Sequence, residues 1–554
     1  MDKVWLKHYP EGVPEEIDVS KYENVLEIFE KSVIQFAEND AYISMHTRMT
    51  YAELDKKSRD FAAFLQHDLG MKRGERFAIM LPNVLQYPVA VFGAIRAGLV
   101  VVNVNPLYTP KELKHQLIDS GATGILVVEN FASVLSKVID DTSVNHVITT
   151  QIGDLLGGMK GVLINTMIKR VKKMVPEFSL PHAIKFNAAL KRGKKQQLNT
   201  VSPQASDLLM LQYTGGTTGV AKGVMLSHRN VVANMLQQVA MVKPFIERGS
   251  EMIVTALPLY HIFAFSCNCL GFMAEGGTNL LIANPRDPKL FAKTISKYPV
   301  TFFAGVNTLF VSLMQEPEFH KIDFSTWKLT FAGGMATQRP VAEKWQKMTN
   351  SPLLEGYGLT ECSPAVSTNP FTIKSFNGSI GVPMCNTEVK ILDEDGKELG
   401  VGEPGEMWVR GPQVMEGYYN RAEETAEVIN DGWLATGDVA KVDDDGFIYI
   451  VDRKKDMILV SGFNVFPNEI EEVVAMMDSV LEVAAIGVPC EKMGEKVKLF
   501  LVTNDGKLDR DEVMNHCREH LTAYKLPREF ELRDELPKTP VGKILRKELK
   551  VQST

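Results

Sequence analysis

The sequence predicts an α/β protein. We expect a large N-terminal domain of mixed and parallel sheets flanked by helices, with a β-subdomain, and then a small α+β C-terminal domain. Strand-like and helix-like runs alternate before Cys385, hairpin patterns begin there, and a charged connector at 452–455 precedes a new set of elements. The 554 residues also exceed the roughly 250–300 at which a single hydrophobic core stops growing.

The first region of the chain is typical of parallel β-structure. The apolar run 76–81 (RFAIML) predicts a strand, 84–97 predicts a buried helix and 100–104 predicts the next strand. We also expect a helix at 230–242 and strands at 123–128, 208–211, 252–256, 300–304 and 329–332. Short strands separated by helical stretches favour an α/β fold with largely parallel sheets.

The pattern changes after Cys385. The runs 387–392 and 405–410 lie on either side of the turn residues Asp395 and Gly396, which favours an antiparallel hairpin. This region is the predicted β-subdomain.

Beyond the connector at 452–455 the sequence predicts a compact α+β unit. Pro467 stands where a first helical residue would, and Asp509 with Glu512 forms a capping pattern for a helix that reaches Leu521. Strands are predicted at 457–460, 482–488 and 496–502.

Composition and charge limit the classes of function. The net charge of −7 gives no reason to expect nucleic acid as a partner. The six cysteines are scattered without zinc-site spacing, which favours free thiols in a reducing compartment. The N-terminus lacks an apolar signal-peptide core, and Arg96 interrupts the longest apolar run, 88–104. A cytoplasmic protein without a membrane-spanning helix is therefore expected.

One segment departs from the acidic average. Between Met159 and Lys195 there are ten basic residues and one acid, Glu177. Apolar residues recur at helical spacing with basic residues around them: Ile164, Met167, Ile168, Val171 and Val175, beside Lys169, Arg170, Lys172 and Lys173. Such a helix lies either on an anionic membrane surface or against its own domain with a solvated cationic edge.

A loop rich in glycine and threonine, YTGGTTGVAKG, spans 213–223. Glycine lets backbone N–H groups approach an anion, the threonines add hydroxyl donors and Lys222 adds a cation. A Walker A loop needs Gly-Lys-Ser/Thr, whereas Ala221 precedes Lys222 and Gly223 follows it. The loop therefore predicts polyphosphate binding of another type, and a turn without a chemical role is the alternative.

Further motifs follow in order. His261 lies in the apolar stretch ALPLYHIFA, where a histidine is more often part of the core than of a site. After AGGMA at 332–336 comes EGYGLTE at 355–361. There Tyr357 offers a flat face to a base, while Thr360 and Glu361 offer groups for a phosphate and its Mg²⁺. A turn with a capped helix start explains that motif equally well.

Two motifs lie nearer the C-terminal end. In DGWLATGD (431–438), Asp438 could accept ribose hydroxyls or be an ordinary turn aspartate. YIVDRKKD (449–456) and SGFN (461–464) follow it. Finally, PKTPVGKILR (537–546) holds Lys543 at a loop tip, where a lone lysine is usually just a solvated charge.

In this order and spacing, the motifs resemble the adenylate-forming acyl-activating superfamily across essentially the whole chain. The family includes acyl-CoA synthetases, luciferases and peptide-synthetase adenylation domains. The segments VWLKHYPEGVP and LQYPVAVFGAIRAGLVVVNVNPLYTP are similar specifically to bacterial long-chain fatty-acid–CoA ligases. The resemblance implies that ATP, with Mg²⁺, activates a long-chain fatty acid as an acyl adenylate that coenzyme A then attacks. A medium-chain or aryl-acid ligase is the alternative.

The resemblance also implies roles for single residues. The catalytic set is Lys543, His261, Thr360 and Glu361, with Glu361 as the Mg²⁺ ligand. Residues expected to bind ATP or AMP are Tyr213, Thr214, Gly215, Gly216, Thr217, Thr218, Gly219, Lys222, Gly333, Gly334, Glu355, Gly356, Tyr357, Thr360, Asp438 and Arg453. Ser461 and Gly462 are expected on the coenzyme A side.

Finally, the resemblance implies a rotation between two domains. Residues 1–452 would hold the acyl and ATP sites, 453–455 would be the hinge, with Lys455 at or beside the hinge position of the family, and 456–554 would move. The apolar stretches 257–272 and 301–313 are candidates for the wall of an acyl tunnel. A membrane-partitioning substrate favours peripheral contact of 159–195 with the inner face of the cytoplasmic membrane. The sequence does not determine the oligomeric state, and a homodimer is one option.

Overall fold

A computed structural model describes residues 3–214, 221–490, 492–539 and 542–553. Its first sheet has the strand order β19-β9-β8-β4-β3-β5-β6-β7. The strands are β3 (Arg76–Met80), β4 (Val100–Asn103), β5 (Gly124–Val128), β6 (His146–Thr150), β7 (Ile184–Lys185), β8 (Leu208–Thr214), β9 (Lys222–Ser227) and β19 (Gly417–Tyr418). All neighbours from β8 to β7 run parallel, and β9 and β19 extend the edge antiparallel. The buried strands β4, up to Asn103 at its end, and β5 are apolar runs because helices cover both faces of a parallel sheet.

The second sheet has the order β16-β15-β14-β13-β12-β10-β11-β1-β2. Its strands are β1 (Asp40–Ser44), β2 (Thr47–Thr50), β10 (Met252–Thr255), β11 (Thr278–Leu281), β12 (Phe302–Gly305), β13 (Leu329–Ala332), β14 (Leu353–Gly358), β15 (Ala365–Thr368) and β16 (Val382–Pro383). The central strands of this sheet, β14-β13-β12-β10-β11-β1 in spatial order, all pair in parallel with their neighbours in that series. The predicted mixed and parallel sheets are thereby confirmed.

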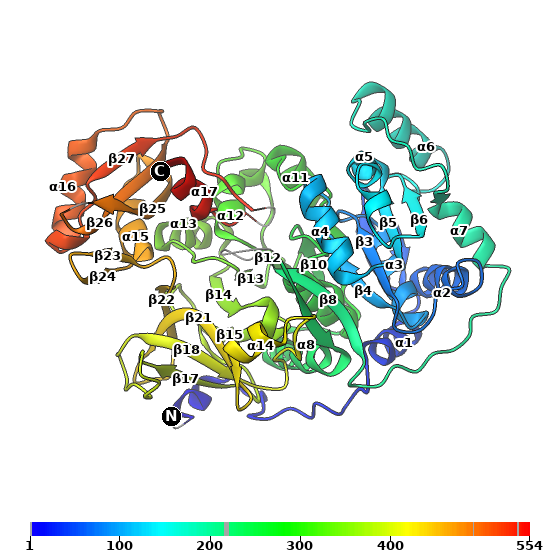
Figure 1. Ribbon diagram of the computed structural model, residues 1–554, viewed down its shortest axis with the longest axis horizontal. Coiled ribbons are helices and arrows are strands. Elements are labelled where there is room, and N and C mark those ends of the chain that lie inside the picture. Colours follow the sequence, from blue (N-terminus) through cyan, green and yellow to red (C-terminus); the bar gives the residue numbers. More distant parts are fainter. Residues whose placement is uncertain (1–2, 215–220, 491, 540–541, 554) are drawn as a thin grey trace.

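Helices pack between and around these sheets (Figure 1). They are α1 (Val25–Gln35), α2 (Tyr51–His67), α3 (Gln86–Arg96), α4 (Pro110–Ser120), α5 (Ala132–Ser136), α6 (Gly158–Thr166), α7 (Phe186–Gly193), α8 (His228–Val242), α9 (Ile262–Ala264), α10 (Phe272–Ala274), α11 (Pro288–Ile295), α12 (Asn307–Met314), α13 (Arg339–Thr349) and α14 (Ala422–Val428). The predicted buried helix is α3, and its charged residue Arg96 is compensated by Asp55 at 2.6 Å.

The β-subdomain is an antiparallel sheet of β17 (Glu388–Leu392), β18 (Gly405–Arg410), β20 (Ile429–Asn430), β21 (Trp433–Val442) and β22 (Ile448–Arg453). The predicted hairpin is confirmed, because Glu388 to Leu392 pair with Arg410 to Glu406.

The C-terminal segment forms the separate lobe coloured orange to red in Figure 1. It contains β23 (Ile458–Val460), β24 (Phe463–Val465), α15 (Pro467–Ala475), β25 (Val480–Cys490), β26 (Gly494–Thr503), α16 (Arg510–His520), β27 (Glu529–Leu532) and α17 (Arg546–Ser553). Pro467 begins α15, and the Asp509 carboxylate accepts from the Glu512 N–H at 3.0 Å at the start of α16, as predicted. The hydrophobic clusters of this lobe draw on residues from 458 onward.

The element directly after the glycine-rich loop is a strand that the sequence did not predict. The loop connects β8 to β9 in a hairpin that pairs Thr214 with Lys222, and α8 begins only at His228. Sequence reasoning missed β9 because its apolar residues form a short continuous run, whose periodicity cannot distinguish a strand from a helix.

The basic segment 159–195 folds into α6, a π-helical turn η4 (Met167–Val171), β7 and α7. Its outer part, α6, stands clear of the sheets at the edge of the N-terminal region (Figure 1). Within the described part of the chain, no helix combines the length and the apolar character needed to cross a membrane.

Candidate active site

A cavity of about 150 Å³ lies beside the carboxyl ends of β13 and β14. Ligands of open α/β sheets bind at such strand ends. The cavity brings together a subset of the predicted residues: His261, Gly333, Gly334, Gly356, Tyr357, Thr360 and Lys543. Lys543 comes from the C-terminal lobe, so the cavity is closed by both parts of the chain.

A tight turn carries Lys543 to this cavity. The Thr539 N–H donates to the Lys543 carbonyl at 2.7 Å, and the Lys543 N–H donates to Thr539 Oγ1 at 3.0 Å. The Thr308 hydroxyl, on α12, donates to the carbonyl of Gly542 at 3.3 Å. A Cβ at Gly334 would lie 3.3 Å from Lys543 Cε, so this glycine permits the close approach of the amine.

Burial controls the charge of the basic groups in the cavity. It lowers the pKa of Lys543 to about 8, and the Arg453 charge adds to the effect, while Asp438 and Glu361 oppose it. Burial, with the charge of Lys543, lowers the pKa of His261 to about 4. His261 is therefore neutral at neutral pH, and its Nδ1 accepts from the Phe263 N–H at 3.4 Å. The cavity thus holds a poorly solvated ammonium beside a neutral imidazole.

Tyr357, Asp438 and Arg453 form a connected group beside the cavity. The Tyr357 hydroxyl donates to Asp438, and Arg453 Nε lies 3.7 Å from the same carboxylate. Asp438 and Arg453 are register partners on β21 and β22, which fixes their separation. Burial and the Asp438 charge raise the pKa of Tyr357 well above its usual value, so the tyrosine is neutral.

Glu361 and Lys222 meet around Tyr418. The Tyr418 hydroxyl donates to Glu361 Oε1 at 2.9 Å, and Lys222 Nζ lies 4.8 Å from the centre of the Tyr418 ring. Lys222 also forms an ion pair with Glu424 on α14. Burial raises the pKa of Glu361 above its usual value, with Tyr418 and Lys222 opposing the shift. An added cation would therefore stabilise this carboxylate.

Glu355 lies behind the cavity wall and is 6% exposed. It accepts from the Thr337 N–H at 2.7 Å, and burial raises its pKa to about 7. In the glycine-rich loop, Gly215, Gly216, Thr217, Thr218 and Gly219 lie outside the described residues. Tyr213, at the end of β8, donates to Asp119 at 2.7 Å.

The apolar wall of the cavity comes partly from unexpected elements. The stretch 257–272 contributes Phe263, Cys267 and Phe272. The stretch 301–313 instead places Phe303 and Phe310 in a separate core around Trp345, which explains its apolar composition without a role in the wall. Sequence reasoning missed other wall residues because α8 and the sheet edge meet only in the tertiary fold: Val239, Met241, Val242, Ile246, Phe331, Phe371 and Met384.

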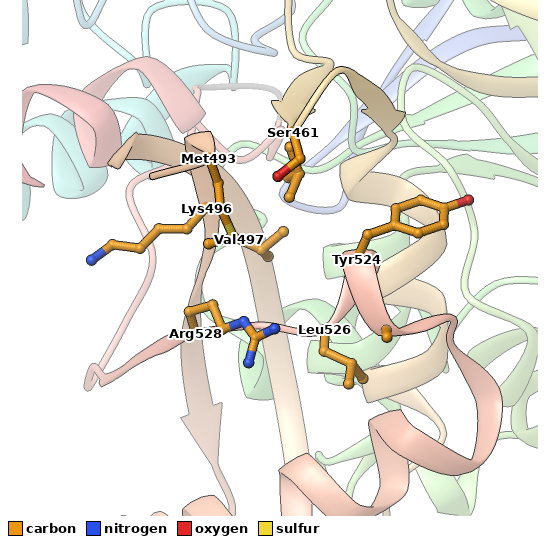
Figure 2. Close-up of a pocket in the computed structure, with 9 residues that line it drawn as sticks. Ser461, Met493, Lys496, Val497, Tyr524, Leu526 and Arg528 are labelled. Atoms are coloured by element: carbon orange, nitrogen blue, oxygen red, sulfur yellow. The ribbon is translucent and has the colours of Figure 1, made fainter. Parts of the chain in front are cut away.

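Ser461 lines a second cavity, of about 220 Å³, in the C-terminal lobe. In Figure 2 the Arg528 guanidinium reaches into the space between Val497 and Leu526, whereas the Lys496 side chain is directed away from it. Lys496 pairs with Glu529 at 2.6 Å. Ser461 and Gly462 form the turn between β23 and β24, with φ angles of 52° and 83°.

Arg546, which sequence reasoning missed, lies beside the junction between β22 and β23. Lys455 lies in the turn there, and the Asp456 N–H donates to the Arg453 carbonyl at 3.0 Å. Beside it, Arg546 at the start of α17 contacts Glu471 at 2.7 Å and the fully buried Asp452 at 3.7 Å.

Burial acts against the charge of Arg546, but the carboxylates of Glu471 and Asp452 raise its pKa above the usual value. Its only sequence signal was its place three residues after Lys543. The network joins β22 to α15 and α17.

Comparison with known proteins places this geometry in a family. The model of the AMP-binding enzyme family matches residues 29–419, and that of the AMP-binding enzyme C-terminal domain matches residues 469–543. The chain is 54% identical to the long-chain-fatty-acid–CoA ligase of Yersinia pestis over 550 residues, which is 99% of this chain and 98% of that protein. It is 51% identical to the ligase of the same name from Haemophilus influenzae over 552 residues, with the same coverage.

Solved structures share the fold. The structure of an anthranilate CoA ligase in complex with anthranoyl-AMP has a TM-score of 0.86 at 24% identity, covering 97% of this chain and 99% of that one. A benzoate CoA ligase from Burkholderia xenovorans has a TM-score of 0.82 at 22% identity, covering 96% and 100%. Because the family model matches most of the chain and its C-terminal partner matches the second lobe, this protein belongs to the AMP-binding enzyme family.

Proposed function

We propose that the protein is an AMP-forming long-chain fatty-acid–CoA ligase. It converts a long-chain fatty acid, ATP and coenzyme A to acyl-CoA, AMP and diphosphate through an acyl adenylate. The observation that carries this proposal is the cavity that joins an apolar wall to Lys543, Tyr357 and Thr360. Relatives of that name at 51–54% identity over nearly the whole chain support the long-chain substrate.

In the first half-reaction a carboxylate oxygen of the fatty acid attacks the α-phosphorus of ATP, and diphosphate leaves. Two anions must meet, so the protein acts mainly by positioning and charge neutralisation. The buried ammonium of Lys543 lies between the fatty-acid carboxylate and the α-phosphate of ATP, and it stabilises the charge on the α-phosphate. Thr360 donates to the α-phosphate, and neutral His261 forms the wall beside the carboxylate.

The nucleotide is held by several elements together. Tyr357 offers its ring to the adenine, with Gly333, Gly334, Glu355 and Gly356 around it, and Asp438 with Arg453 binds the ribose. Tyr213 and the loop from Thr214 to Lys222 bind the β- and γ-phosphates. The Lys222–Glu424 pair would open when phosphate competes for the lysine.

Glu361 fits a Mg²⁺ site. Magnesium in nucleotide enzymes takes one or two carboxylates and completes its shell with phosphate oxygens and water. Glu361 supplies a half-buried carboxylate with Oε1 bonded to Tyr418, next to the proposed phosphate-binding residue Lys222. When bound, Mg²⁺ would neutralise charge on the phosphates, while Tyr418 orients the carboxylate.

In the second half-reaction the thiol of coenzyme A attacks the acyl carbonyl and AMP leaves. In the proposed mechanism Lys543 occupies the approach to that carbonyl. We therefore propose that residues 456–554 rotate against 1–452 about a hinge at 453–455, with Lys455 as the hinge residue. Ser461 and Gly462 then face coenzyme A. The adjoining cavity offers Arg528 to its phosphates.

Thioester formation tests the overall assignment. The purified enzyme, with ATP, Mg²⁺ and coenzyme A, is assayed against saturated acids from medium to long chain and against an aryl acid. We expect the highest kcat/KM with long-chain acids. A maximum with medium-chain or aryl acids would favour the alternative ligase, and acyl binding without AMP release would refute ligase activity.

The long-chain substrate also has a consequence for where the enzyme acts. Such acids partition into bilayers, so we propose that the protein works in the cytoplasm in peripheral contact with the membrane, through the basic segment 159–195. A homodimer is compatible with this arrangement, and analytical ultracentrifugation tests it.

A further inference from the structure

The inner side of α6 is fixed to its own domain. Gly161 is buried so close to Gly153 that a Cβ there would lie 2.4 Å from the Gly153 oxygen. Asn165 Oδ1 accepts from the Gly153 N–H at 2.7 Å, and Ile168 is buried one turn later. Ile164 also packs against the core. The apolar residues Ile164 and Ile168, predicted from the sequence as part of a docking face, therefore face the protein.

The outer side of α6 carries a different apolar set. Met159, Val162 and Leu163 are 89%, 67% and 69% exposed, and beyond the helix Val171 and Met174 are 74% and 53% exposed. Positions three and four apart share one helix face, and a π-turn, with more residues per turn, rotates Val171 toward that face.

The described ranges contain fifteen exposed large hydrophobic residues, and five of them are concentrated in the short segment 159–174. Such clustering marks an interaction surface rather than scattered exposure. We call these five residues the outer face.

The basic residues of the segment fall into two classes. Several are occupied within the protein: Lys160 with Met45 and Thr47, Lys169 and Lys185 with the buried Glu129, and Arg192 with Asp68. By contrast, Arg170, Lys172 and Lys173 are exposed and make no ion pair or side-chain hydrogen bond with the described residues. They lie on either side of Val171 in the sequence, so unpaired cations accompany the outer face.

We propose that the outer face, with Arg170, Lys172 and Lys173, docks on the surface of an anionic lipid bilayer. Apolar side chains insert at the boundary between headgroups and acyl chains, while the cations meet lipid phosphates. A second copy of this chain fits less well, because a two-fold interface would bring these three cations against the same three cations. The inference rests on the proposed long-chain ligase, whose substrate lies in such bilayers.

Flotation of the full-length protein with vesicles tests the proposal. Vesicles of phosphatidylcholine containing about a third phosphatidylglycerol are compared with phosphatidylcholine alone, at low salt and at 0.5 M NaCl. We expect the triple variant R170Q/K172Q/K173Q to bind anionic vesicles about 100-fold less, since each basic residue near the surface contributes about fivefold. Salt weakens the binding of the parent protein because it screens exposed charges.

Matched controls separate the outer face from general charge and apolarity. The variant K191Q/K194Q/K195Q removes the same charge from exposed lysines on and just beyond α7, and it should bind vesicles as the parent does. V162S/L163S should lose about tenfold in binding. I34S/L290S, which changes apolar side chains that are 79% and 57% exposed elsewhere, should not.

Equal loss in R170Q/K172Q/K173Q and in its α7 control would overturn the proposal, as would unchanged binding in V162S/L163S. A change in oligomeric state in V162S/L163S without a change in vesicle binding would assign the face to a second copy instead. Ligase activity is measured in parallel on a detergent-dispersed acid. Normal activity together with normal vesicle binding in all variants would refute only the proposed docking face. An inactive parent protein would refute the ligase assignment.

Discussion

At the scale of single residues, Lys543 is the group that we propose to act differently in the two half-reactions. It lines the cavity from the C-terminal lobe. In the proposed mechanism its ammonium neutralises charge during adenylation and obstructs the thiol afterwards. We expect Lys543→Ala to slow adenylation by about 100-fold or more. Thioester formation from pre-made acyl adenylate should continue at nearly the parent rate. Pyrophosphate exchange measures the first half and AMP release the second, and equal loss in both would contradict the assignment.

The charge of Lys543 also predicts a pH dependence. Because burial lowers its pKa to about 8, the amine is protonated below that pH and becomes neutral above it. The kcat/KM for adenylation should therefore fall as pH rises through about 8.

A Lys543→Arg variant provides the control, since guanidinium stays charged throughout. This variant should lack the alkaline fall whatever its absolute rate. A parent-like fall in that variant would show that another group titrates. At this scale the sequence predicted Lys543, Tyr357 and Asp438 as site residues. It could not predict their contacts, because these join three separate elements of the fold.

At the scale of elements, Arg546 links α17 to α15 and to the end of β22. Arg546→Lys keeps the charge but loses the fork that contacts Glu471 and Asn468 at 2.7 Å each. We expect adenylation to fall about tenfold, because a charge-assisted hydrogen bond of about 1.5–3 kcal/mol is weakened. The reaction of pre-made adenylate should change less.

Arg546→Ala leaves buried carboxylates unpaired, so it should lower stability by about 3–5 kcal/mol in thermal or denaturant unfolding. Arg518→Lys on α16, whose guanidinium bonds only to Asn515 among the described side chains, is the matched control. An equal loss of both half-reactions in Arg546→Lys would mean that Arg546 supports only folding. Its role escaped sequence reasoning because its partners lie 75 to 94 positions away in the chain.

At the scale of the whole molecule, the turn between β22 and β23 would absorb the rotation that we propose. Lys455→Pro fixes one backbone angle there, so we expect thioester formation to fall far more than adenylation. Lys455→Ala, which keeps backbone freedom, should behave like the parent. Half-reaction rates measure the effect, and circular dichroism checks the fold. Normal turnover in Lys455→Pro would place the hinge elsewhere.

The sequence by itself determined the type of those elements that carry clear local signals, and the chemistry available. Period and turn signals are local, so β3, α3, the β17–β18 hairpin and the capped helix α16 could be predicted, as could the motifs that carry the site. Only the tertiary structure decided which residues meet. Strand order, the partners of Arg546, the wall contributed by α8 and the side of α6 that faces solvent depend on contacts between distant segments. A local pattern carries no information about the packing that selects such contacts.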